Sequence, residues 1–155
     1  NSILALNTAV KAGFDETIML DPEGYVAEAS AANVFLLRDG VLHTPEVTSC
    51  LQGITRDSVI RLAREVLNIE VQERRITRDE LYTADEAFVT GTAAELLPLR
   101  ELDGRHIGAR AGAPPPGQPI AEASLTARLQ RLYKQVTRGD LDDDLQGFAG
   151  WLTGV

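Results

Sequence analysis

The stretch "NVFLLRDGVLHTP", residues 33–45, carries the clearest local signal in the sequence. Two apolar runs flank Asp39-Gly40, and this dipeptide favours the tight turn that joins two antiparallel strands. A second hairpin is predicted downstream, around Asp103-Gly104. Because these hairpins stand beside segments with helical periodicity, the sequence indicates an α/β fold of the mixed α+β kind, whose sheet is not purely parallel.

Helical and extended patterns occur on both sides of the first hairpin. Apolar side chains recur at helical spacing in residues 2–11, and Gly13 follows as a plausible stop. Thr55 is the expected N-cap of a second helix, and the Thr77…Glu80 spacing of a capping box opens a short third one. The remaining predictions are buried strands over 16–21 and 86–91, a strand over 69–76, a linker over 112–119, a helix over 120–139 and a loosely packed end over 147–155.

Composition limits the class of protein. The 155 residues suit one domain with a hydrophobic core, and 44% hydrophobic with 25% charged residues is typical of globular proteins. A formal net charge of −8 argues against nonspecific nucleic-acid or membrane binding, and no apolar run is long enough to span a membrane. The single cysteine, Cys50, favours a reducing, cytoplasmic setting. Residues 1–14 read like the middle of a helix, so we expect a piece of a longer protein.

The loop "CLQGITRD", residues 50–57, has the composition of an anion site. Gly53 permits close approach of a ligand to the backbone. Ile54 and Thr55 then present free amides at a helix start, where the helix dipole is positive, and Thr55 adds a hydroxyl. Taken alone, the loop is better explained as an ordinary helix N-terminus.

The loop "TGTAAE", residues 90–95, is a second candidate for anion binding. A strand ends at Gly91, and Thr92, Ala93 and Ala94 follow without bulky side chains. Successive free amides at the end of a strand form a nest for a carboxylate or a phosphate. Taken alone, this loop is better explained as a strand-to-helix turn that Thr92 caps.

Glu28 opens the small and apolar run "EASAANVF", residues 28–35, where a carboxylate is costly unless a positive group meets it. The alternative is a strand glutamate that faces water. His43 and His106 lie in the two hairpin regions, so we expect both to be solvated. Cys50 has no base beside it in the sequence and is not interpreted as a nucleophile. No group of His, Cys, Asp and Glu has metal-ligand spacing, so no metal site is predicted.

These motifs together resemble the signature of the class IV pyridoxal-phosphate aminotransferases. The signature consists of Glu28-x-Ser30-x-x-Asn33-Val34-Phe35, Leu42-x-Thr44 and Leu51-x-Gly53-Ile54-x-Arg56. Within that class the chain is most similar to the branched-chain amino acid aminotransferases, over "LDPEGYVAEASAANVFLLRDGVLHTP" (20–45), "GITRDSVIRLARE" (53–65) and "LYTADEAFVTGTAAELLPLRELDGR" (81–105). The likeness runs from residue 1 to roughly residue 138.

The resemblance implies the large domain of a fold type IV enzyme, a mixed sheet or pseudo-barrel with flanking helices, over residues 1–138, followed by a tail over 139–155. It also implies the cofactor pyridoxal 5'-phosphate, which withdraws electrons when its pyridine nitrogen is protonated. Glu28 is implied to face that nitrogen. Leu51 is implied to contact the ring. The phosphate is implied to bind at Gly53, Ile54 and Thr55 and to the hydroxyls of Thr55 and Thr92. The substrate carboxylate is implied to bind to the amides of Thr92 and Ala93.

The resemblance also implies that the lysine that forms a Schiff base lies a few residues upstream of Asn1, together with a smaller N-terminal domain. The chain contains two lysines, Lys11 and Lys134, and neither matches the position of that lysine. No catalytic residue is therefore predicted within these residues, and we expect the isolated chain to be inactive.

The activity implied for the parent protein moves the amino group of leucine, isoleucine or valine to 2-oxoglutarate, so the expected partners are amino acids and 2-oxo acids. The resemblance further implies a homo-oligomer, a dimer or a higher assembly. Ala29, Ala31 and Ala32 depart from the glycines or polar residues of many relatives. The alternatives are a D-amino acid aminotransferase or an aminodeoxychorismate lyase of the same fold, or a non-catalytic truncated module for binding or assembly.

Overall fold

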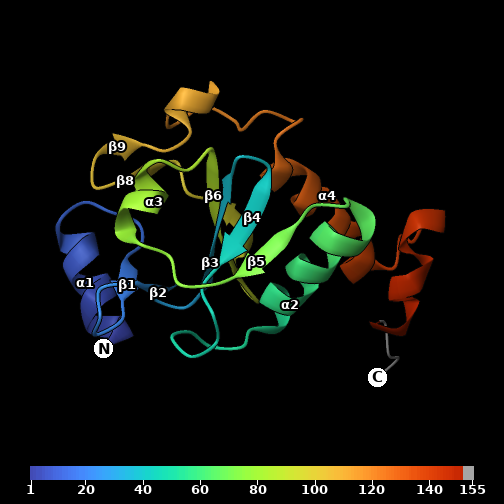
Figure 1. Ribbon diagram of the computed structural model, residues 1–155, viewed down its shortest axis with the longest axis horizontal. Coiled ribbons are helices and arrows are strands. Elements are labelled where there is room, and N and C mark those ends of the chain that lie inside the picture. The colour runs from blue at the N-terminus through green and yellow to red at the C-terminus, as the bar shows by residue number, and fades with distance from the viewer. Residues whose placement is uncertain (152–155) are drawn as a thin grey trace.

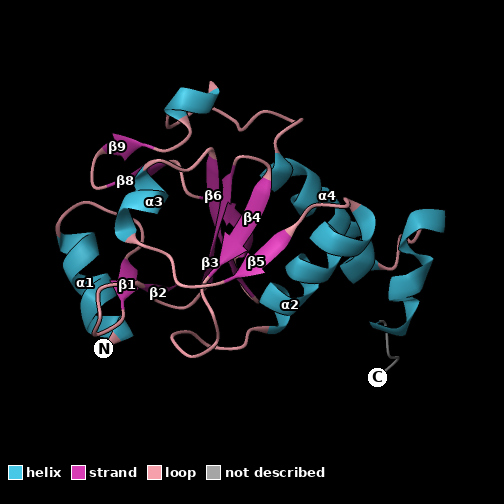
Figure 2. Cartoon of the chain, in the orientation of Figure 1, coloured by secondary structure: helices cyan, strands magenta, loops and turns pink. Residues whose placement is uncertain are grey.

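A five-stranded mixed sheet forms the centre of the computed structural model, which describes residues 1–151 (Figures 1 and 2). The strands lie in the order β5-β4-β3-β6-β7, in which β4 and β5 are parallel and the other neighbours are antiparallel. Their bounds are Asn33–Arg38 for β3, Val41–Thr44 for β4, Val71–Glu73 for β5, Glu86–Gly91 for β6 and Glu95–Pro98 for β7. The prediction of a mixed sheet is therefore confirmed.

Both predicted Asp-Gly hairpins are present. Asp39 and Gly40 have φ values of 50° and 79°, and Asp103 and Gly104 have values of 49° and 75°. Two consecutive residues with positive φ form the turn whose twist matches that of antiparallel strands. The first turn joins β3 to β4, and the second joins β8 (Glu101–Leu102) to β9 (Arg105–His106).

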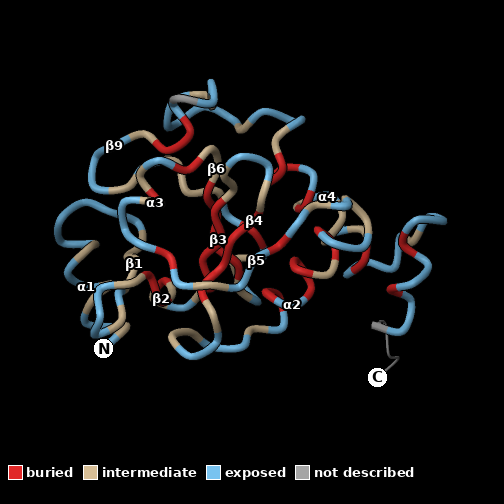
Figure 3. Tube along the Cα trace, in the orientation of Figure 1, coloured by how far each residue is buried: buried red, intermediate tan, exposed pale blue. Residues whose placement is uncertain are grey.

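The strands of the sheet lie in the buried centre of the molecule, red in Figure 3, and hydrophobic clusters cover both faces of the sheet. Side chains alternate between the two faces along each strand. On one face Phe35 of β3 stacks on Phe88 of β6, with ring centroids 5.1 Å apart. Val34, Leu36 and Val89 belong to a separate cluster on the other face. The hydrophobic runs of the sequence are thus shared between two cores.

Helices and a small sheet cover these two faces (Figure 1). Helices α2 and α4 with the π-helical segment η1 pack on the face that carries Phe35, and β2 and α3 pack on the other. No helix among residues 1–151 combines the length and the apolar character that a membrane span needs. The bounds are α1 Ser2–Lys11, β1 Ile18–Leu20, β2 Val26–Ala29, α2 Ile54–Arg61, η1 Leu62–Val66, α3 Arg78–Tyr82, η2 Ala109–Ala111, α4 Leu125–Arg138 and η3 Asp143–Trp151.

The helix starts agree with the sequence in part. The capping box of Thr77 and Glu80 is confirmed, since each side chain accepts a hydrogen bond from the backbone of the other residue. The prediction that Thr55 is an N-cap is wrong. Gly53 is the N-cap, because it has extended φ and ψ values of −73° and 140° and the helix already includes Ile54.

Helix α4 begins later than predicted, at Leu125. Its start is fixed by the hydroxyl of Ser124, which accepts a hydrogen bond from the amide of Ala127. In addition, the Glu86 carboxylate accepts hydrogen bonds from the amides of Leu125 and Thr126, each at 2.8 Å. A carboxylate at this position satisfies free amides and complements the helix dipole.

Two predictions about packing are wrong. The strand predicted over 16–21 is not buried, and Leu20 is 44% exposed, because β1 pairs with β2 in a two-stranded sheet outside the main one. The loose packing predicted for 147–155 is wrong at Phe148, which is 2% exposed and belongs to the same core cluster as Phe35. The last part of that prediction, 152–155, lies outside the described residues.

Replacing Glu80 by Ala is expected to lower the free energy of unfolding by about 1–2 kcal/mol near neutral pH, because the capping box and the 2.7 Å ion pair with Arg74 are lost. Burial raises the pKa of Glu80, but hydrogen bonds from Arg74 and Thr77 outweigh it and lower the pKa from 4.5 to about 2. The stabilisation is therefore complete above pH 4.5 and disappears as the pH falls through about 2. Urea unfolding of the variant and of Asp79→Ala as control, at several pH values, tests this. A pH-independent difference from wild type would contradict it.

Candidate functional site

Both candidate anion loops lie against the segment that precedes β3. A Cβ atom on Gly53 would lie 2.3 Å from Oδ1 of Asn33, the first residue of β3. A Cβ atom on Gly91, at the end of β6, would lie 3.1 Å from the carbonyl oxygen of Ala31. The structure thus brings the start of β3, the end of β6 and the start of α2 together at one end of the sheet.

The start of α2 has the features of an anion site. Gly53 caps the helix with its backbone, and no side chain accepts a hydrogen bond from the first turn. Among the hydrogen bonds of residues 1–151, none is donated by the amides of Ile54 and Thr55. Free amides at the positive end of a helix dipole bind phosphate or carboxylate groups. The Ile54 side chain is 86% exposed, so it does not close this end of the helix.

The Thr55 hydroxyl, which the resemblance assigns to the phosphate, lies near a hydroxyl of another helix. Its residue is buried, and Oγ1 lies 3.5 Å from the hydroxyl of Tyr133 on α4. The hydroxyl therefore faces the core side of α2 in this structure. The Thr55 amide remains free at the start of the helix, and the contact of the Thr55 hydroxyl with a phosphate stays a prediction.

Glu28 meets the backbone of the first loop. It is half-buried on β2, and its Oε2 accepts a hydrogen bond of 3.0 Å from the amide of Leu51. The alternative of a glutamate that simply faces water is therefore wrong. No ion pair to Glu28 occurs within residues 1–151, and its second oxygen has no hydrogen-bond donor there. The carboxylate thus has one oxygen fixed by the protein and one available to a ligand.

The second loop joins two antiparallel strands. Gly91 of β6 pairs with Glu95 of β7, so residues 92–94 form a hairpin connection, and the alternative of a strand-to-helix turn is wrong. Thr92 and Ala93 are exposed, and their amides donate no hydrogen bond within the described part of the chain. The loop therefore keeps the backbone donors that an anion would use.

Three buried polar residues lie near the loops; Asn33 and Arg56 belong to the family signature but received no role in the sequence analysis, and Thr90 was not singled out. Asn33 is 6% exposed and donates from Nδ2 to the carbonyl oxygen of Leu51 at 2.7 Å. Arg56 is 3% exposed, and Thr90 is fully buried with a hydroxyl that has no partner among the described residues. Polar residues inside or beside apolar runs were the available signal, because burial of such groups requires a partner.

The histidines and the cysteine have no catalytic environment. The prediction that both histidines are solvated is wrong: His43 is 7% exposed and accepts a 3.1 Å hydrogen bond from Arg74, and Nε2 of His106 is buried without a partner in residues 1–151. Burial lowers the pKa of His43 and raises that of Cys50, which keeps both groups neutral. No cluster of three or more metal-ligating side chains occurs in the described residues.

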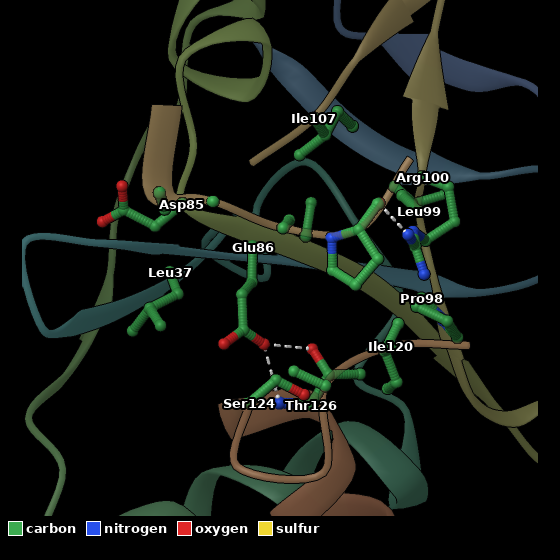
Figure 4. Close-up of a pocket in the computed structure, with 16 residues that line it drawn as sticks. Leu37, Asp85, Glu86, Pro98, Leu99, Arg100, Ile107, Ile120, Ser124 and Thr126 are labelled. Atoms are coloured by element: carbon green, nitrogen blue, oxygen red, sulfur yellow. Dashed lines mark hydrogen bonds between the residues drawn. The ribbon is translucent and has the colours of Figure 1, made fainter. Parts of the chain in front are cut away.

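A cavity of about 360 Å³ lies at the opposite end of β6, under the segment 107–121 (Figure 4). Its charged side chains already have partners: Asp85 accepts from the amide of Asp39, Glu86 binds the start of α4, and Arg100 donates to the carbonyl oxygens of Pro114, Pro115 and Gln118. The rest of its lining is mainly apolar. This cavity therefore offers volume but no free polar group, and we place the candidate site at the loops instead.

Comparison of the sequence with known proteins identifies relatives. The family described as amino-transferase class IV matches residues 1–102. The chain is 52% identical over 139 residues to the branched-chain-amino-acid aminotransferase of Pseudomonas aeruginosa, covering 90% of this chain and 42% of that protein. It is 44% identical over 156 residues to the probable branched-chain-amino-acid aminotransferase of Aquifex aeolicus, covering 100% of this chain and 46% of that protein. The chain therefore spans about half the length of these relatives.

Solved structures give the same picture of the fold. The branched-chain amino acid aminotransferase of Thermobaculum terrenum, in its PLP form, superposes with a TM-score of 0.86 at 39% identity, covering 99% of this chain and 47% of that one. The enzyme of the same name from Escherichia coli gives a TM-score of 0.79 at 40% identity, with 92% and 45% covered. The mixed sheet with its flanking helices is thus shared with both.

Proposed function

The chain belongs to the class IV aminotransferases, and from this we propose that it is the cofactor-binding large domain of an enzyme that transfers the amino group of branched-chain L-amino acids to 2-oxoglutarate. The proposed cofactor is pyridoxal 5'-phosphate, which supplies an electron sink when it is bound. The observation that carries the proposal is that Glu28 accepts a hydrogen bond from the amide of Leu51, three residues before the free amide of Ile54 at the start of α2.

The residues present fit the phosphate and the ring of such a cofactor. The amides of Ile54 and Thr55 hold the phosphate, and Gly53 lets it approach the backbone. Leu51, which is 74% exposed, would contact the ring face. Glu28 would keep one oxygen on the Leu51 amide, and its other oxygen would stabilise a protonated ring nitrogen through a charge-assisted hydrogen bond.

The second loop serves the substrate. The Thr92 and Ala93 amides hold the carboxylate of the amino acid, and the Thr92 hydroxyl contacts the phosphate. Support for this comes from the exposure of both residues and from the contact of Gly91 with Ala31, close to the β2 end that carries Glu28.

The group that bonds covalently to the cofactor and moves the proton is proposed to be a lysine outside these 155 residues. Lys11 lies at the exposed end of α1, and Lys134 lies on an exposed face of α4. Neither residue belongs to the elements that form the site. The described residues thus supply binding and electrostatic stabilisation, and the catalytic lysine comes from another part of the protein.

We also propose a homo-oligomer, a dimer or higher, in the cytoplasm. Exposed apolar side chains on α1, among them Ile3 at 77% and Leu4 at 71%, leave a surface for contact with more protein. The half-buried free thiol of Cys50 fits a reducing compartment.

The isolated 155-residue chain is expected to bind pyridoxal phosphate without a covalent bond, because both of its lysines lie outside the site. Borohydride reduction followed by mass spectrometry tests this, in parallel with a longer chain that includes the upstream lysine. The longer chain should acquire one pyridoxyl group on that lysine and transaminate leucine with 2-oxoglutarate. A stoichiometric adduct on Lys11 or Lys134 of the short chain would place the active site elsewhere, and a longer chain that binds no cofactor would favour a non-catalytic module.

A further inference from the structure

We propose that Asn33 is a positioning residue that fixes the carboxylate of Glu28 through the backbone of Leu51. This inference rests on the proposed function, because Glu28 is the residue assigned there to the ring nitrogen of the cofactor. Asn33 itself touches neither the cofactor nor the substrate in this assignment.

Two hydrogen bonds connect the three residues in series. Asn33 donates from Nδ2 to the Leu51 carbonyl oxygen at 2.7 Å, and the Leu51 amide donates to Oε2 of Glu28 at 3.0 Å. The Leu51 side chain adds little anchoring, because it is 74% exposed. Asn33 is well fixed, since it is 6% exposed and pairs with Thr90 in the sheet. The rigid strand β3 thus holds an exposed loop, and the loop holds Glu28.

The same side chain accounts for Gly53. The φ of Gly53 is −73°, which any L-residue adopts, so backbone conformation does not require glycine here. The requirement comes from Asn33, because a Cβ atom on residue 53 would lie 2.3 Å from its Oδ1. Asn33 therefore contacts the loop through both ends of its amide, with Nδ2 on Leu51 and Oδ1 on Gly53.

The phosphate end of the site has a separate anchor. Arg56, in the first turn of α2, donates from Nη2 to the carbonyl oxygen of Pro45 at 2.8 Å and to Glu73 at 2.9 Å. These contacts hold the amides of Ile54 and Thr55 without Asn33. Loss of the Asn33 donor should therefore weaken contacts to the ring of the cofactor and leave phosphate binding unchanged.

The test uses Asn33→Ala, which removes the donor without adding a charge beside the phosphate site, in the longest natural chain that contains this segment. Hydrogen exchange at the Leu51 amide should accelerate at least about tenfold, whereas exchange in β3 and β6 stays as in wild type. Affinity for pyridoxamine phosphate should fall about fivefold, the loss typical of one hydrogen bond, and affinity for inorganic phosphate should change less than about twofold. Gln52→Ala, in the same loop, is the matched control and should change none of these values.

A double-mutant cycle separates positioning from a general loss of stability. Gly53→Ala should weaken pyridoxamine phosphate binding about fivefold in the wild-type background and less than about twofold in the Asn33→Ala background, because the clash is then gone. Unchanged exchange at Leu51 in Asn33→Ala, equal losses for the two ligands, or additive effects in the cycle would each overturn the proposal. Failure of the wild-type chain to bind pyridoxamine phosphate would instead overturn the proposed function, while the exchange measurement still tests the hydrogen-bond chain.

Discussion

Replacement of Glu28 by Gln is expected to lower the rate of transamination by about 10- to 100-fold in a chain that also supplies the lysine. A charge-assisted hydrogen bond contributes about 1.5–3 kcal/mol, and each 1.4 kcal/mol changes a rate by about tenfold. Gln keeps an oxygen that accepts the Leu51 amide, so the loop that Glu28 holds stays in place. What disappears is the negative charge that favours the protonated ring nitrogen.

A matched control for this substitution exists in the same region. Glu16 is half-buried, and its carboxylate accepts hydrogen bonds from the amides of Thr17 and Ser30. Glu16→Gln should leave the rate within about twofold of wild type, because its partners are neutral amides and it has no assigned role at the ring. Steady-state rates with leucine and 2-oxoglutarate, together with protection of the Leu51 amide, test both variants. An unchanged rate in Glu28→Gln would remove Glu28 from the proposed ring contact.

Local signals in the sequence predicted those elements whose geometry depends on neighbouring residues. The Asp-Gly turns and the Thr77–Glu80 capping box are formed within four consecutive residues, so their sequence patterns are sufficient. Burial depends instead on what packs on an element. His43 lies on a strand of the predicted hairpin, but this strand, β4, has a neighbouring strand on each side. Phe148 packs in a core that consists mainly of residues far away in the chain.

In the candidate site, too, the features set by neighbouring residues were predictable and the contacts between distant residues were not. The amides of Ile54 and Thr92 were predictable, because a glycine before a helix and small residues after a strand leave backbone donors free. The direction of the Thr55 hydroxyl depends on Tyr133, which is 78 residues away in the sequence, and no local pattern reports it. The contact between Asn33 and Leu51 likewise joins residues that are 18 positions apart. The resemblance to a family assigned residues to the site, and the structure adds which of these residues are hydrogen-bonded to one another.

A second large effect is expected on stability when Arg56, which attaches the first turn of α2 to the carbonyl oxygen of Pro45 and to Glu73, is replaced. Arg56 is a buried cation with few contacts. Arg56→Ala is expected to lower the free energy of unfolding by about 3 kcal/mol, from loss of the buried stem and of the donor to the Pro45 carbonyl oxygen. For a chain of this size, the midpoint of thermal unfolding should fall by roughly 6–12 °C. Phosphate affinity should fall as well, since the first turn of α2 loses its attachment.

Glu73→Gln separates the two contacts of Arg56. Glu73 is 38% exposed, so water screens part of its ion pair with the buried Arg56, and Gln keeps an oxygen that can accept from Nη2. This variant should lose about 1–2 kcal/mol, less than Arg56→Ala, while the bond to Pro45 remains. The difference between the two variants then measures the buried part of the anchor, which is the part that fixes the helix start. Thermal and urea unfolding of both proteins check this. Equal losses in Arg56→Ala and Glu73→Gln would mean that the exposed ion pair, and not the buried carbonyl contact, holds α2 in place.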